Sequence, residues 1–191
     1  MRGKIGIDID GVITDEGDDE NNIWHNSLCD YFGEELERKN DVFDFTRAYE
    51  LTEKKIDEFI SDNIKDIYKR VNPAFKVKEV LGKLIKLDFE IILITARNNK
   101  FRKLTENWLR KHSIPYNELI HEENKAPLAK KIKIDIFIED NKDNIIQLNK
   151  YGIAVIIMDR YHNRQIQADK NIFRAYNWKD IEKYIFKYFS L

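Results

Sequence analysis

The sequence predicts an α/β protein, in which helices cover both faces of a parallel sheet and a small helical cap follows the first strand. Strand-like and helix-like patterns alternate from about Lys76 onward, which indicates parallel strands joined by helical crossovers. The run 91–94 is wholly apolar, as expected of a strand buried on both faces. Segment 16–73 has helical patterns and no convincing strand. We therefore interpret residues 1–15 and 74–191 as the core, and 16–73 as the cap.

The first predicted strand covers residues 4–9, where isoleucines alternate with small or charged residues. Apolar residues at helical spacing then predict a helix over 22–36. Thr52 is suited to cap a second helix whose apolar stripe continues to Tyr68. Between these helices, residues 40–50 are irregular and aromatic, and Pro73 marks the end of the helical segment.

Beyond Pro73 the predicted elements alternate regularly. Amphipathic patterns predict helices over 76–88, 101–111, 126–133, 141–151 and 178–189. Apolar runs predict strands over 91–94, 117–121, 134–138 and 153–158. We take the strand at 153–158 as the last one of the core.

Composition limits the class of protein. The chain has 191 residues, 42% hydrophobic and 35% charged, which suits one globular domain with an inserted subdomain. The net charge of −1 argues against strong binding to a nucleic acid polymer or to an anionic membrane. The single cysteine, Cys29, excludes an intrachain disulfide. There is no apolar run long enough to cross a bilayer, and the first strand leaves no room for a signal peptide, so we expect a cytoplasmic protein.

Polar residues follow three of the predicted strands. Asp8 and Asp10 follow the first, Thr95 ends another, and Glu139 and Asp140 follow a third. Because the carboxyl ends of parallel strands meet at one edge of a sheet, these side chains should lie together. Clustered carboxylates repel one another, and a hard divalent cation such as Mg²⁺ would relieve that repulsion. A bound cation would also allow an anionic phosphate to bind, and Lys125 precedes a predicted helix near the same edge.

Four motifs in order give the chain a family resemblance. "GIDIDGV", "LITAR", Lys125 in "ENKAPLAKKIKID", and "IFIEDNKDN" resemble the motifs of the haloacid dehalogenase (HAD) superfamily of phosphohydrolases. The resemblance covers roughly residues 1–15 and 72–159. Within that superfamily, the position of the cap is similar to that in the 5'(3')-deoxyribonucleotidase family, which implies a Rossmann-like core.

The resemblance implies a role for each matched residue. Asp8 would be the nucleophile that forms an aspartyl-phosphate, and Asp10 would be the general acid and then the general base. The phosphoryl oxygens would be bound by Thr95, Ala96, Lys125 and the backbone at Gly11.

The same resemblance implies a Mg²⁺ site. Asp8, Asp140 and the main-chain carbonyl of Asp10 would hold the ion. Glu139 and Asn144 would be either further ligands or residues that orient the ligands. The family usually has aspartate at the position of Glu139, which leaves the role of Glu139 open.

The cap allows two interpretations. Its aromatic residues, Trp24, Phe43, Phe45 and Tyr49, either form the core of the cap or contact substrate. In the second case Phe43 or Phe45 would stack on a nucleobase, and Arg47 would reach a polar edge of that base. We favour Arg97 as a structural ion-pair partner over a substrate contact.

The favoured hypothesis is a Mg²⁺-dependent phosphomonoesterase that acts on (deoxy)nucleoside monophosphates. The expected partner is a small phosphate ester, with no nucleic acid polymer and no membrane. One alternative keeps the chemistry but takes a sugar phosphate or another small phosphate ester. A receiver-like signalling domain and a non-catalytic phosphate-binding protein are further alternatives. The sequence leaves open the preferred base and sugar, the choice of 5' or 3' phosphate, and the oligomeric state, although a homodimer is compatible with it.

Overall fold

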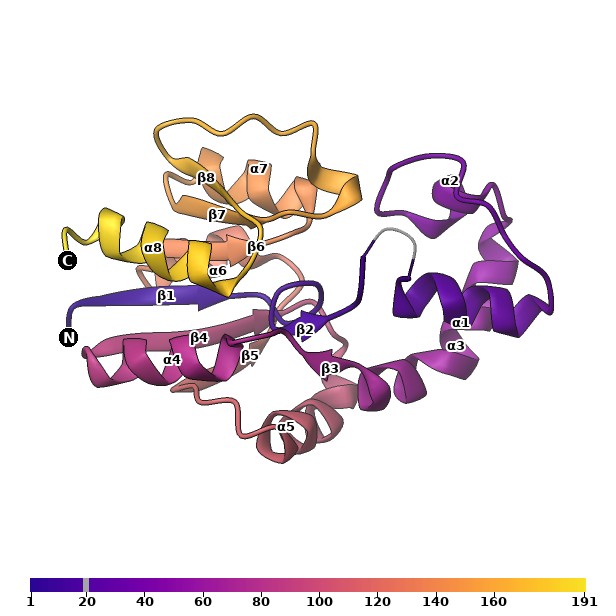
Figure 1. The fold of residues 1–191 in the computed structure, drawn as a ribbon, viewed down its shortest axis with the longest axis horizontal. Helices are drawn as coiled ribbons and strands as arrows, with labels where there is room; N and C mark the ends of the chain where they lie inside the picture. The colour runs from indigo at the N-terminus through magenta and orange to yellow at the C-terminus, as the bar shows by residue number, and fades with distance from the viewer. Residues whose placement is uncertain (19–20) are drawn as a thin grey trace.

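A computed structural model describes residues 1–18 and 21–191, and its centre is a six-stranded parallel sheet (Figure 1). The strand order is β5-β4-β1-β6-β7-β8. Their bounds are Gly3–Ile7 (β1), Phe89–Thr95 (β4), Glu118–His121 (β5), Ile136–Glu139 (β6), Ala154–Met158 (β7) and Ile172–Ala175 (β8). The predicted α/β class with a parallel sheet is confirmed.

The first strand lies at the centre of the sheet. Ile5 of β1 is in register with Ile91 of β4 on one side and with Ile136 of β6 on the other. From β1 the chain builds outward through β4 and β5, and then crosses back to build β6, β7 and β8. The order of the strands therefore reverses beside β1, and a ligand crevice is expected there in such a sheet.

Alternate residues of the strands face two helical layers. Ile91 and Leu93 belong to one apolar cluster, whereas Ile92 and Ile94 belong to another. The first cluster includes residues of α4 (Val77–Lys86), α5 (Arg102–Lys111) and α8 (Trp178–Tyr188). The second includes residues of α6 (Lys125–Lys131) and α7 (Lys142–Lys150). This two-sided burial explains why the central strands are continuous apolar runs.

Three further helices lie to one side of this core, beyond the carboxyl ends of the strands (Figure 1). They are α1 (Ile23–Phe32), α2 (Phe45–Tyr49) and α3 (Glu53–Arg70). They share a separate apolar cluster that includes Leu28, Tyr49, Phe59 and Ile67. The chain crosses toward these helices at β2 (Thr14–Asp15) and returns at β3 (Asn72–Pro73), and the two strands pair antiparallel. We propose residues 16–73 as the cap, as the sequence suggests.

Two parts of the structure differ from the sequence-based expectations. The prediction that 153–158 is the last core strand is wrong, because β8 pairs with β7 at the edge of the sheet. This strand has only four residues, and two of them are only half buried, so it lacks the apolar run of the central strands. The irregular segment 40–50 contains the short helix α2, which begins after the capping side chain of Asp44.

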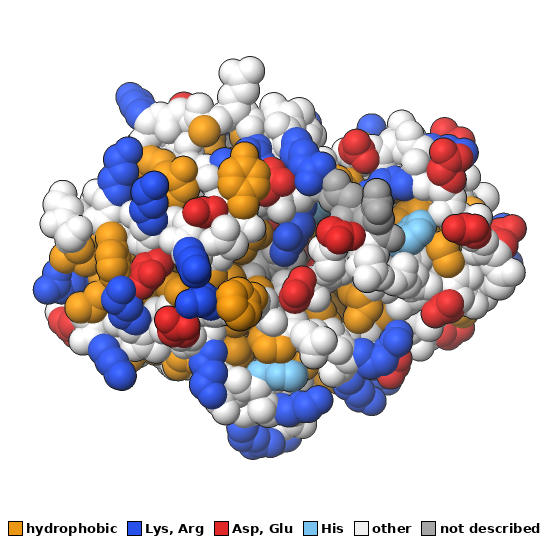
Figure 2. All heavy atoms as spheres, viewed as in Figure 1, with side chains coloured by type: hydrophobic (Ala, Val, Ile, Leu, Met, Phe, Trp, Pro, Cys, Tyr) orange, Lys and Arg blue, Asp and Glu red, His pale blue; other side chains and the backbone are white. Residues whose placement is uncertain are grey.

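Basic and acidic side chains are interspersed over most of the face drawn in Figure 2. The 310 helices η1 (Asn99–Phe101) and η2 (Tyr161–Asn163) complete the elements described. Among the residues that the structure describes, no helix is both long and apolar enough to cross a membrane.

Candidate functional site

The polar residues predicted to meet at the edge of the sheet do meet there. They lie at a cavity of about 610 Å³ between the carboxyl ends of the strands and the cap helices. Its core-side lining includes Asp8, Asp10, Ala96, Arg97, Lys125, Asp140 and Asn144. A second cavity, between α3 and α5, is lined by lysines and by an apolar floor and contains none of these carboxylates. The first cavity is therefore the candidate site.

A buried lysine joins two of the acids. Lys125 Nζ lies 2.8 Å from Asp8 Oδ1 and 2.8 Å from Glu139 Oε2. All three side chains are at least nine-tenths buried. Although burial opposes a charge on Lys125, the two carboxylates outweigh it and raise the pKa of the ammonium group. Lys125 therefore remains cationic beside Asp8.

The second oxygen of Glu139 is also engaged. Glu139 Oε1 accepts hydrogen bonds from the backbone N–H groups of Asp140, at 3.3 Å, and Asn141, at 3.0 Å. These two N–H groups belong to the turn that leads into α7, whose cap is Asn141. Glu139 thus fixes Lys125 to this turn, a contact that its position in the sequence did not reveal.

The acidic cluster has the donor chemistry of a hard cation site. Oxygen atoms of Asp8, Glu139 and Asp140 lie within 4.8 Å of one another. Burial raises the pKa of Asp8 well above its usual range; Lys125 opposes this shift, and the neighbouring acids add to it. A buried cluster of carboxylate oxygens fits a divalent cation such as Mg²⁺, which prefers oxygen ligands and would offset the repulsion among the acids.

Gly11 allows Asp140 to approach the first strand. Its φ is +70°, and a Cβ at this position would overlap Oδ2 of Asp140. The main-chain oxygen of Asp140 accepts a hydrogen bond from Asn163 Nδ2 at 2.8 Å. Arg160 Nη2 donates to the carbonyl of Gly11 at 2.6 Å. The loop after β7 therefore helps to hold both residues.

Asp10 makes a two-point ion pair with Arg97. Arg97 Nε donates to Asp10 Oδ2 at 2.8 Å, and Nη2 donates to Oδ1 at 2.6 Å. The Arg97 side chain is fully buried, whereas that of Asp10 is 29% exposed. The preference for Arg97 as an ion-pair partner therefore agrees with its contacts, and its partner is a candidate catalytic acid.

The remaining predicted phosphate ligands lie close by. Thr95 is buried at the end of β4, and its hydroxyl accepts a hydrogen bond from the N–H of Arg97 at 3.2 Å. Ala96 and Asn144 line the cavity, whereas Thr95 and Gly11 are buried and are not among its lining residues.

The cap supplies an apolar wall opposite the carboxylates. It consists of Trp24, Phe43, Phe45, Ile56, Ile60, Ile64 and Tyr68. Trp24 and Phe45 also pack against the apolar cluster of the cap, and Tyr49 is a buried member of that cluster. Of these four aromatic residues, Phe43 is the one that is largely exposed, and it lines the cavity together with Trp24 and Phe45.

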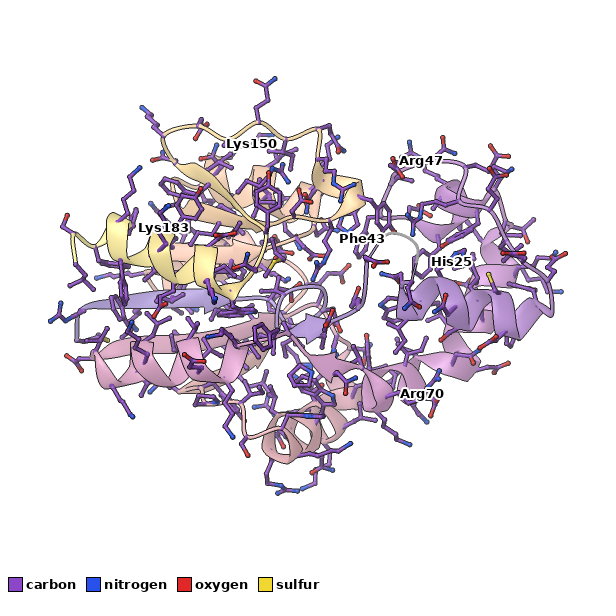
Figure 3. The ribbon with its side chains drawn as sticks, in the orientation of Figure 1. His25, Phe43, Arg47, Arg70, Lys150 and Lys183 are labelled. Carbon is purple, nitrogen blue, oxygen red and sulfur yellow. The ribbon has the colours of Figure 1, made fainter. Side chains whose placement is uncertain are left out.

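Phe43 and Arg47 lie at different places on the cap (Figure 3). Phe43 lies on the side of the cap that faces the core, where its ring centroid is 5.2 Å from that of His162. Arg47 is exposed on α2 and does not line the cavity. The structure therefore does not bring Arg47 to the other candidate residues.

Sequence reasoning did not identify Glu16 and Tyr68 as residues of the cavity. Glu16 follows β2 and lines the cavity, where burial, together with Asp10 and Asp140, raises its pKa to about 8. Its only signal in the sequence was a charge a few residues after Asp8 and Asp10. Tyr68 ended an apolar stripe, but the sequence could not show that this stripe faces a cavity.

Comparison with known proteins agrees with this geometry. Residues 2–189 match the model of the family "5' nucleotidase, deoxy (Pyrimidine), cytosolic type C protein". A nucleotidase of Clostridium acetobutylicum is 32% identical over 181 residues, which are 93% of this chain and 91% of the relative. A candidate 5'(3')-deoxyribonucleotidase of Chlorobaculum tepidum is 26% identical over 186 residues, covering 93% and 87% of the two chains.

Solved structures support the fold. A haloacid dehalogenase-like hydrolase from Streptococcus pneumoniae aligns with a TM-score of 0.68 at 13% identity, over 96% of this chain and 98% of that one. Together with the near-complete family match, this alignment confirms the predicted HAD resemblance and identifies a phosphomonoester hydrolase. The chain belongs to the 5' nucleotidase, deoxy (Pyrimidine), cytosolic type C family.

Proposed function

We propose that this protein is a Mg²⁺-dependent nucleotidase that hydrolyses (deoxy)nucleoside monophosphates through an aspartyl-phosphate. The observation that carries the proposal is the contact between the buried Asp8 and Lys125, because it lies in a cavity with carboxylates on one wall and aromatic residues on the other. Such a cavity suits a ligand with an anionic end and an apolar ring.

In the first step an oxygen of Asp8 attacks phosphorus, and the bond from phosphorus to the ester oxygen breaks. For this step Asp10, whose two oxygens accept hydrogen bonds from Arg97 in the structure, must first take up a proton. It then gives that proton to the departing oxygen, so the nucleoside leaves as a neutral alcohol. Lys125 neutralises charge around the attacking carboxylate and the phosphoryl oxygens. The products of this step are the phosphorylated Asp8, ionised Asp10 and the nucleoside.

In the second step Asp10, now a carboxylate, accepts a proton from water. The water oxygen attacks phosphorus, the bond to Asp8 breaks, and inorganic phosphate leaves. Asp8 is regenerated as a carboxylate and Asp10 as an acid. The partial exposure of Asp10 is consistent with access by water.

The cation would be held by Asp8, Asp140 and the main-chain carbonyl of Asp10, with Asn144 able to orient these ligands. When bound, it would supply positive charge for the phosphoryl oxygens. We assign Glu139 a different role, because its oxygens already contact Lys125 and two backbone N–H groups. Glu139 would keep Lys125 directed at Asp8.

The apolar wall of the cavity favours a nucleotide over a sugar phosphate as the substrate. A sugar offers hydroxyl groups, which would lose hydrogen bonds to water against Ile60, Ile64 and Phe43. A nucleobase offers a flat ring that can stack on Phe43 or Phe45. Arg47 does not line the cavity, so it has no role in the proposed recognition.

The test is phosphate release from a panel of phosphomonoesters with Mg²⁺, with the Asp8→Asn protein as the control. We expect release from deoxynucleoside monophosphates to exceed release from sugar phosphates, and to be absent in Asp8→Asn. A preference for sugar phosphates would refute the proposed nucleotide substrate but would leave the proposed catalytic mechanism intact. Phosphate release that persists in the Asp8→Asn protein would refute the assignment of Asp8 as the nucleophile.

A cytoplasmic location and a homodimer remain predictions. The first is based on the single cysteine, which is usual in a reducing compartment. Fractionation of the host cell and light scattering of the purified protein would test the two.

A further inference from the structure

The side chain of Arg97 lies between the core and the cap. On one side it makes the two hydrogen bonds to Asp10, and its Nη1 also donates to the hydroxyl of Thr105 at 3.4 Å. On the other side its Cζ lies 3.7 Å from the centre of the Tyr68 ring. Asp10 and Thr105 belong to the core, whereas Tyr68 is part of cap helix α3.

Tyr68 is itself held in place. Its ring is 7% exposed and makes edge contacts with Trp24, at 6.1 Å between centroids, and with Phe101, at 5.7 Å. Trp24 is on α1 of the cap, and Phe101 is on the core segment before α5. A shift of α3 relative to the core would therefore move Tyr68 across the guanidinium of Arg97.

The geometry restricts Asp10 as well. A guanidinium that donates two parallel hydrogen bonds fixes both the direction and the plane of a carboxylate. Stacking on an aromatic ring then fixes the plane of the guanidinium itself. Arg97 thus links the Asp10 carboxylate to a residue of the cap.

We propose that Arg97 is a positioning residue for Asp10, and that Tyr68 couples the position of cap helix α3 to the orientation of that carboxylate. The inference rests on the proposed function, in which Asp10 transfers the proton. The same helix supplies Ile56, Ile60 and Ile64 to the cavity wall. A substrate that fills the cap side of the cavity would therefore fix α3, and part of its binding energy would be used to orient the acid.

The coupling predicts a dependence on the leaving group. A nucleoside leaves as an alkoxide and needs the proton from Asp10, whereas 4-nitrophenyl phosphate releases a stabilised phenolate that needs none. For an enzyme with a phosphoryl intermediate, kcat/KM reports only the steps up to release of the first product. The ratio of kcat/KM for the nucleotide to kcat/KM for 4-nitrophenyl phosphate therefore measures proton transfer from Asp10.

The experiment measures this ratio in the wild-type protein with Mg²⁺ and in Asp10→Asn, Arg97→Met, Arg97→Lys, Tyr68→Leu and Tyr68→Phe. We expect Asp10→Asn to lower the ratio at least about 100-fold, and Arg97→Met to lower it at least about tenfold. Arg97→Lys keeps the positive charge but cannot donate two parallel hydrogen bonds to Asp10, so the ratio of the kcat/KM values should also fall in this variant. Tyr68→Leu should lower the ratio more than Tyr68→Phe, which keeps the ring.

A double variant separates positioning from damage to the fold. If Arg97 acts through Asp10, the Asp10→Asn/Arg97→Met protein should have the same ratio as Asp10→Asn alone. Equal losses on both substrates in the Arg97 variants, or no loss on either, would overturn the inference while the nucleotidase function stands. A wild-type protein that hydrolyses neither ester, or an Asp10→Asn ratio that is unchanged, would refute the proposed function, and the inference would fall with it.

Discussion

The ammonium group of Lys125 lies 2.8 Å from Oε2 of Glu139, and neither side chain reaches solvent. Because Glu139 also accepts two backbone N–H groups, this contact ties the lysine to the turn between β6 and α7. The pair therefore stabilises the fold and directs Lys125 toward Asp8 at the same time.

Replacing Glu139 should weaken both effects. Glu139→Gln removes one charge of a buried pair, and we expect it to lower the free energy of unfolding by about 3 kcal/mol. Urea denaturation measures this loss, and phosphate release should fall as well. Glu123→Gln, at an exposed acid of the same cavity, is the control and should change stability by less than about 0.5 kcal/mol. Equal stability of the two variants would contradict the assigned contact.

Divalent cation binding should stabilise the protein through Asp140. At a Mg²⁺ concentration 100 times the dissociation constant, about 2.7 kcal/mol of stability is gained. For a chain of this size that corresponds to a rise in Tm of about 5–10 °C. Asp140→Asn should abolish the rise, whereas Asp143→Asn, an exposed acid on the same turn, should keep it. Chelation by EDTA should stop phosphate release in the wild-type protein, and added Mg²⁺ should restore it.

Gly11 and Gly33 form a matched pair for testing the approach of Asp140. Both have φ near +70°, so alanine strains the backbone at either position. Only at Gly11 does the added Cβ overlap Asp140; at Gly33 there is no atom within 4 Å. We expect Gly33→Ala to cost about 1 kcal/mol and Gly11→Ala to cost about 1–3 kcal/mol more. If calorimetry finds equal losses, Gly11 is needed for its backbone alone.

Glu16 should make the metal-free protein less stable at high pH. Its pKa is raised from 4.5 to about 8, chiefly by burial, so the folded protein binds more protons than the unfolded chain between these values. Stability contributed by protonated Glu16 is therefore present at low pH and is lost as the pH rises to about 8. In EDTA, Glu16→Gln should raise the free energy of unfolding by roughly 2–4 kcal/mol at pH 9 and by much less at pH 5. The same gain at both pH values would contradict this explanation.

Phe43 is the best-placed residue to test base recognition. Its side chain is 57% exposed and lines the cavity, so it can be removed without opening the cap core. Loss of a stacked base costs about 1–3 kcal/mol, which corresponds to a rise in KM for the nucleotide of at least about fivefold in Phe43→Ala. Phe75→Ala, an exposed aromatic residue outside the cavity, is the control. A KM that is the same in both variants would exclude stacking on Phe43.

Local pattern was enough to predict the core of the fold. Each central strand is an apolar run because both its faces are covered, and each of α4, α7 and α8 has an apolar stripe at helical spacing. The edge strand β8 was missed because it is short and half exposed, and it therefore lacks the continuous apolar run that indicates a buried strand.

The predicted parallel arrangement of the strands similarly indicated where the candidate site lies, since polar residues after parallel strands share an edge. Asp8, Lys125 and Asp140 could therefore be named from their positions alone. The particular partners could not be named: Glu139 for Lys125, and Arg97 for Asp10. These contacts join distant parts of the chain and depend on rotamers that local sequence does not fix.

By itself, the sequence determined the parallel sheet and the edge that carries the carboxylates. Those features follow from periodicity and connectivity, which are local properties. Only the tertiary structure decided that Phe43 faces the cavity while Arg47 does not, and that Tyr68 of the cap stacks on the arginine that holds Asp10. The physical reason is that the side of a helix that meets another subdomain is set by packing between segments far apart in the sequence, and an apolar stripe looks the same whether it covers a core or lines a cavity.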